Sequence, residues 1–74
     1  MDPATLVRMA NQIAAFFSAQ SHDEAVAGIS AHIRSFWEPR MRQGLYAVMD
    51  GGGEGLEGLV VEAAADLRKS EARP

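Results

Sequence analysis

The chain has 74 residues, no cysteine and a formal net charge of −3 at neutral pH. At this length it is a single domain that buries only about 60% of the surface exposed by its unfolded form, so we expect a core of marginal stability. Small scaffolds without disulfides or thiolate metal sites commonly rely on a partner subunit, and the acidic balance argues against a general nucleic-acid binder.

The first helix is predicted from Pro3 to about Gln20, because Asp2 before Pro3 has the pattern of an N-cap with proline at the first helical position. Its apolar residues keep the spacing of one helical face: Leu6, Met9, Ala10, Ile13, Phe16 and Phe17. The other side is typical of a solvated face and carries Arg8, Asn11, Gln12 and Ser18. Because neighbouring residues on a helix point about 100° apart, we expect either Phe16 or Phe17 to face a partner.

A second helix is predicted to end at about Trp37, and it begins where Ser21 and Glu24 have the spacing of a capping box. The residues that continue the apolar period are Val26, Ile29, Ile33, Phe36 and Trp37. Gly28 costs this helix up to ~1 kcal/mol relative to alanine. We therefore expect Gly28 to permit the close approach of a neighbouring helix.

Pro39 predicts a junction between helices at Glu38–Pro39, because proline breaks a helix that precedes it and suits the first turn of a new one. The third helix carries an apolar side, with Tyr46 offset from it, made of Met41, Leu45, Val48 and Met49. The segment from Asp50 to Gly55 then ends this helix.

Glycine-rich loops before helices can bind phosphate through their backbone N–H groups, but such loops follow a β-strand. Here the run follows a helix, contains Glu54 and lacks the Lys and Ser/Thr of a phosphate loop, so we interpret it as a flexible connector. A fourth helix is predicted from about Leu56 to Lys69, and residues 70–74 are expected to be a frayed tail. The sequence therefore predicts one all-α domain over residues 1–74, a small bundle of three to four short helices joined by tight turns and a Gly-rich loop.

No residues in the sequence form a recognisable catalytic, cofactor-binding or metal-binding motif. His22 and His32 are ten residues apart, without the i, i+4 spacing of a helical zinc pair, and we expect them in an exposed loop and on an outer face or interface. The serines lack a Ser-His-Asp context. The sequence also shows no signal peptide and no run of 18 apolar residues, so we expect no membrane contact and a cytoplasmic location.

Three cations near the junction are the best candidates for contacts with another chain. Arg34, Arg40 and Arg42 lie within nine residues, and cations in the first turn of a helix oppose its macrodipole. They could be solvated, be paired internally with Glu38 or Asp50, or bind a carboxylate of a partner. Trp37 is either a core residue or an interface residue. The candidate interface consists of Phe17, Arg34, Trp37, Arg40 and Arg42.

Two stretches carry a resemblance to a known family. They are the run Met9-Ala10-Asn11-Gln12-Ile13 and the run Trp37-Glu38-Pro39-Arg40-Met41-Arg42, supported by Leu59-Val60 in the last helix. From about Thr5 to Leu67 the chain resembles the delta subunit of soluble NAD-dependent formate dehydrogenases. It differs at Glu38, where the family usually has Asp, and at Gly58, where some relatives have Pro.

The resemblance implies a non-catalytic subunit of a cytoplasmic complex that converts formate and NAD⁺ to CO₂ and NADH. In that family the alpha subunit holds a molybdenum or tungsten bis-pyranopterin cofactor and iron-sulfur clusters, the beta subunit holds FMN, and the gamma subunit holds another cluster. The delta subunit binds no cofactor and is expected to support the assembly or stability of alpha. A free-standing helical adaptor or regulatory protein is the alternative, and a small enzyme or metal binder is a third hypothesis.

Overall fold

The computed structural model describes residues 1–72, which form four helices and no strand. These are α1 (Pro3–Phe17), α2 (His22–Phe36), α3 (Pro39–Asp50) and α4 (Gly58–Ala72). The predicted all-α class is therefore confirmed.

The predicted helix ends differ from the observed ones by up to three residues. The first helix ends at Phe17 instead of Gln20, and the second ends at Phe36, one residue before Trp37. The last helix begins two residues later than predicted and continues to Ala72. Residues 70–72, which we expected to be frayed, are therefore helical, and the rest of the predicted tail, residues 73–74, lies outside the described residues.

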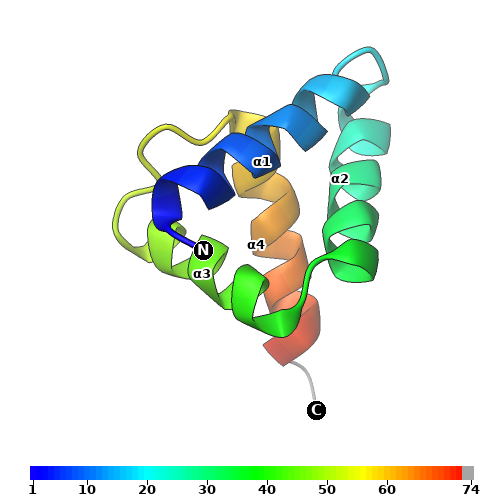
Figure 1. Cartoon of the computed structure of the whole chain (residues 1–74). Coiled ribbons are helices and arrows are strands. Elements are labelled where there is room, and N and C mark those ends of the chain that lie inside the picture. The colour runs from blue at the N-terminus through cyan, green and yellow to red at the C-terminus, as the bar shows by residue number, and fades with distance from the viewer. Residues whose placement is uncertain (73–74) are drawn as a thin grey trace.

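Helix α4 packs most extensively against α2 and also contacts α1 and α3 (Figure 1). Helix α1 in turn contacts α2 and α3 as well as α4. The core lies between these helices, and its largest fully buried side chains are Ile29, Ile33, Leu45, Val60 and Leu67. Burial of each such side chain contributes about 1.5–3 kcal/mol.

Each of the first three helices begins as its sequence predicts. The carboxylate of Asp2 accepts a hydrogen bond from the N–H of Thr5 at 2.8 Å, and Pro3 follows at the first helical position. Ser21 and Glu24 form the predicted capping box at the start of α2. Pro39 begins α3, but the preceding Glu38 makes no side-chain bond to that helix.

Two glycines allow side chains of α1 to pack directly against neighbouring helices. A Cβ atom added to Gly28 of α2 would lie 2.5 Å from Cε1 of Phe17. One added to Gly44 of α3 would lie 2.6 Å from Cδ1 of Leu6. The expected close approach at Gly28 is therefore present, although the atoms that meet the glycine belong to a side chain.

The Gly-rich loop connects α3 to α4, as predicted, and Asn11 of α1 holds its end. Gly52, Gly53 and Gly55 have φ values of 115°, 68° and 86°, which side chains rarely adopt. The Asn11 amide donates to the carbonyl of Gly55 at 2.8 Å and accepts from the N–H of Glu57 at 2.9 Å. The Glu57 carbonyl in turn accepts the first hydrogen bonds of α4. The prediction that Asn11 lies on a merely solvated face was wrong.

We predict that Asn11→Ala destabilises the protein by about 1 kcal/mol, because two hydrogen bonds worth ~0.5–1.5 kcal/mol each are lost while alanine has the better helix propensity. For a domain of this size the melting temperature should fall by about 4–8 °C. Urea unfolding followed by circular dichroism measures the change. Gln12→Ala, on the next, exposed residue, is the matched control, and equal stability of the two variants would contradict the role of Asn11.

Candidate partner-binding surface

The five residues predicted to contact a partner lie in different environments. Trp37 is only 5% exposed and belongs to the hydrophobic core. Phe17 and Arg42 are partly buried, whereas Arg34 and Arg40 are exposed. Trp37 is thus a core residue, as one of its two alternatives had it. The interface assignment of all five residues, Trp37 included, stays a prediction, and their environments decide what each could do.

Arg42 is held by groups of the same chain. Its Nε donates to the Glu71 carboxylate at 2.7 Å, and its Nη1 donates to the carbonyl of Trp37 at 2.8 Å. The hydroxyl of Tyr46 donates to the other oxygen of Glu71. We call Arg42, Tyr46 and Glu71 the C-terminal cluster.

The sequence suggested Glu38 and Asp50 as internal partners for Arg42, and this prediction was wrong. Asp50 instead accepts two hydrogen bonds from the guanidinium of Arg68, at 2.7 and 2.9 Å. That guanidinium also lies 5.3 Å from the centre of the Tyr46 ring. Glu71 was missed because it falls in the segment that we expected to be frayed.

The C-terminal cluster favours the charged form of Glu71. The hydrogen bond from Tyr46 is the largest influence and lowers the pKa of Glu71, and the Arg42 guanidinium lowers it further, against the opposing effect of burial. Burial and the neighbouring carboxylate raise the pKa of the Tyr46 phenol, which keeps its proton on the oxygen. The cluster therefore joins the end of α4 to α3 through a charged carboxylate.

An apolar groove of about 380 Å³ lies between α1 and the end of α2. We call it the α1–α2 groove, and its lining residues are Met9, Gln12, Ile13, Phe16, Phe17, His32 and Trp37. Phe16 is 79% exposed, and its ring meets that of Phe17 edge to face at 5.2 Å. Of the two phenylalanines expected to divide between core and surface, Phe16 is thus the exposed one.

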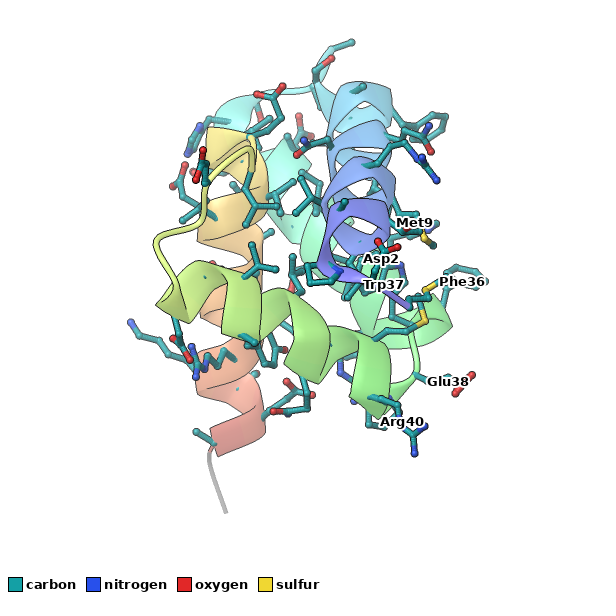
Figure 2. All side chains as sticks on the ribbon, turned by 60° about the vertical axis from the view of Figure 1, so that its left-hand side comes forward. Asp2, Met9, Phe36, Trp37, Glu38 and Arg40 are labelled. Carbon is teal, nitrogen blue, oxygen red and sulfur yellow. The ribbon has the colours of Figure 1, made fainter. Side chains whose placement is uncertain are left out.

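Phe36 extends the apolar surface at the end of α2, although its spacing had placed it with the core residues. It is 73% exposed, and its ring lies 4.8 Å from that of His32 in the α1–α2 groove. Figure 2 shows Phe36 and Met9 projecting from the same edge of the molecule, above Glu38 and Arg40. Contiguous exposed aromatic side chains of this kind mark interaction sites.

The second histidine lies elsewhere, at the first turn of α2. The Nε2 of His22 is 2.9 Å from a carboxylate oxygen of Glu62 on α4, and this hydrogen bond raises the pKa of His22. Over residues 1–72, no group of three or more His, Cys, Asp or Glu side chains is placed to hold a metal ion. In the same range no helix has the length and apolar character needed to cross a membrane.

Comparison with known protein families identifies the family of the chain. A family model for the NADH-dependent formate dehydrogenase delta subunit FdsD matches residues 5–64. The chain belongs to this family. No curated protein and no solved structure matched it. The resemblance seen in the sequence is therefore confirmed, and the family match spans every residue that lines the α1–α2 groove.

We predict that charge reversal affects the stability of the protein differently at Arg42 and at Arg40, the two arginines of α3. Arg42→Glu should destabilise the isolated FdsD-family chain by about 1–3 kcal/mol, because it places two carboxylates together and leaves Glu71 without its cation. Arg40→Glu is the matched control and should change the free energy of unfolding by less than about 0.5 kcal/mol, as expected for an exposed residue. Chemical denaturation measures both, and equal effects would refute the assignment.

We predict that the protein loses stability in acid partly because the Glu71 carboxylate becomes protonated there. Because the pKa of Glu71 is lowered from its ordinary value of 4.5, its contribution is fully present above about pH 4.5 and is lost as the pH falls through the folded-state pKa. The pKa values of Asp2 and Asp50 are also lowered, so part of the acid sensitivity remains without Glu71. Unfolding free energies measured between about pH 5 and 3 should fall less steeply for Glu71→Gln than for the unaltered chain.

Glu54→Gln is the control for this measurement, since Glu54 lies in the exposed connector and has no ion pair within residues 1–72. It should keep the slope of the unaltered chain. A Glu71→Gln variant with that same slope would show that the cluster does not hold the carboxylate in its charged form.

Proposed function

We propose that this chain is a non-catalytic subunit of a cytoplasmic NAD-dependent formate dehydrogenase, and that it supports the assembly or stability of the catalytic alpha subunit. Family membership supports its place in such a complex. The observation that carries the binding role is the α1–α2 groove, with Phe16 and Phe36 exposed at its margins. A 74-residue domain has little apolar surface to spare, so aromatic rings left outside the core favour a role in binding.

In this proposal the redox chemistry belongs to the other subunits. The complex oxidises formate to CO₂ and reduces NAD⁺, with a molybdenum or tungsten bis-pyranopterin and iron-sulfur clusters on alpha, FMN on beta and a further cluster on gamma. The described residues of this chain do not fit such groups, because there is no cysteine and the two histidines lie apart, one beside Glu62 and one in the apolar groove. We therefore assign no electron-transfer or proton-transfer step to this chain.

A subunit of this kind stabilises its partner simply by binding to the partner's folded form. A protein that binds only the folded form of alpha stabilises it by about 2.7 kcal/mol when present at 100 times its dissociation constant. The same coupling stabilises the small subunit, whose own core is limited by its length. Each chain therefore gains stability from the other, and neither has to contribute a reacting group at the shared surface.

We predict that the tagged chain co-purifies with alpha when all subunits are produced together. Complex assembled without it should lose formate-dependent NAD⁺ reduction faster on heating, and purified alpha should contain less metal and pterin. Activity half-lives and metal analysis of the two preparations measure these differences.

The opposite result would be a chain that purifies alone and unfolds cooperatively, together with a complex of unchanged lifetime and cofactor content. That outcome would favour the free-standing adaptor over the subunit.

A further inference from the structure

None of the residues that line the α1–α2 groove is Asp or Glu, although the exposed Glu38 follows the lining residue Trp37 and lies below Phe36 (Figure 2). The chain has ten Asp and Glu residues, yet none lies in residues 3–17 or 25–37, the two segments that provide every lining residue of the groove. The acids lie at the helix ends, in the Gly-rich connector and along α4. An otherwise acidic protein therefore presents an apolar groove without negative charge.

An exposed cation of α1 lies one helical turn from a lining residue of this groove. Arg8 is exposed on α1 and lies one helical turn before Gln12, so the two side chains are neighbours on the helix surface. Arg8 forms no ion pair within residues 1–72. The carboxylate of Asp2, near the start of the same helix, is engaged with the N–H of Thr5.

The form of the groove limits what it can bind. Its volume of about 380 Å³ lies between two helices, the exposed Phe16 forms part of its lining, and the exposed Phe36 contacts the lining residue His32. Residues 1–72 contain no strand whose edge a partner could extend. Grooves between helices commonly bind the apolar face of another helix, through side chains spaced three or four residues apart.

We infer that the α1–α2 groove binds an amphipathic helix from a larger subunit of the complex, with its apolar side against Phe16 and Phe36 and with Asp or Glu side chains at its edge reaching Arg8. This inference rests on the proposed function and names the surface and the chemistry of the contact. A second copy of this chain fits less well, because in a symmetric contact each α1–α2 groove would meet another groove whose lining residues include no Asp or Glu to pair with Arg8.

The apolar contact is tested with the double variant Phe16→Ser/Phe36→Ser in the assembled complex. Both rings are exposed, so the isolated variant should keep the helicity and unfolding midpoint of the unaltered chain. Loss of two aromatic contact residues should weaken binding to the remaining subunits by about 30-fold or more. Val61→Ser is the matched control, since Val61 is another exposed apolar residue but lies on α4 outside the groove, and its affinity should stay within about threefold.

The charge contact is tested with Arg8→Glu against Lys69→Glu, an exposed cation near the end of α4. Arg8→Glu should slow association and make its rate less dependent on salt, whereas Lys69→Glu should leave both unchanged. Photocrosslinking from p-benzoylphenylalanine in place of Phe16 identifies the bound segment. The expected product is a helix of a larger subunit with apolar residues on one side and Asp or Glu beside them.

The outcomes separate this inference from the proposed function. If the unaltered chain assembles with the other subunits and the groove variants assemble equally well, the groove is not the binding surface, while the subunit role stands. Crosslinking to a strand, to a basic segment or to a second copy of this chain would also overturn the inference. If the unaltered chain fails to assemble at all, the proposed function itself is lost.

Discussion

The packing of α4 against the other three helices is the constraint on which the rest of this structure depends. Ala63 and Ala64 are fully buried on this helix, and their small side chains let neighbouring backbones come close. Ile29 and Ile33 of α2 are also fully buried in the same core. Because α1 and α2 direct their inner faces to this core, the rings of Phe16 and Phe36 stay largely exposed and contact neighbouring side chains of their own helices, Phe17 and His32.

Both ends of α4 are held by residues from the two stretches that carry the family resemblance. At its start, Asn11 of the first stretch binds the backbone of Gly55 and Glu57. Near its end, Arg42 of the second stretch joins Glu71 to the carbonyl of Trp37, at the junction of α2 and α3. One polar residue of each stretch, Asn11 and Arg42, therefore helps to position α4.

The features that were predicted correctly from the sequence are those that depend on residues close together in the chain. The caps at Asp2 and Ser21, the junction at Pro39 and the apolar stripes depend on residues within a few positions of each other, and the structure contains each of them. The partners of Asn11 and Arg42 lie 44 and 29 residues away, and no local pattern could name them. Phe36 kept the spacing of a core residue and is exposed, because periodicity gives the side of a helix but not how far the neighbouring helices extend over it.

The division between structural and binding residues follows from the same geometry. At the corner after α2, Trp37 and Arg42 are held by contacts within the fold, whereas Glu38 and Arg40 are exposed and project below Phe36 (Figure 2). An exposed phenylalanine gains little for the isolated chain, but its burial against a partner removes apolar area worth about 25 cal/mol per Å². In the inference drawn above, a partner helix buries this exposed apolar area, and none of the residues that line the α1–α2 groove carries a negative charge. In that inference, specificity comes from the lack of acidic lining residues as much as from the aromatic contacts.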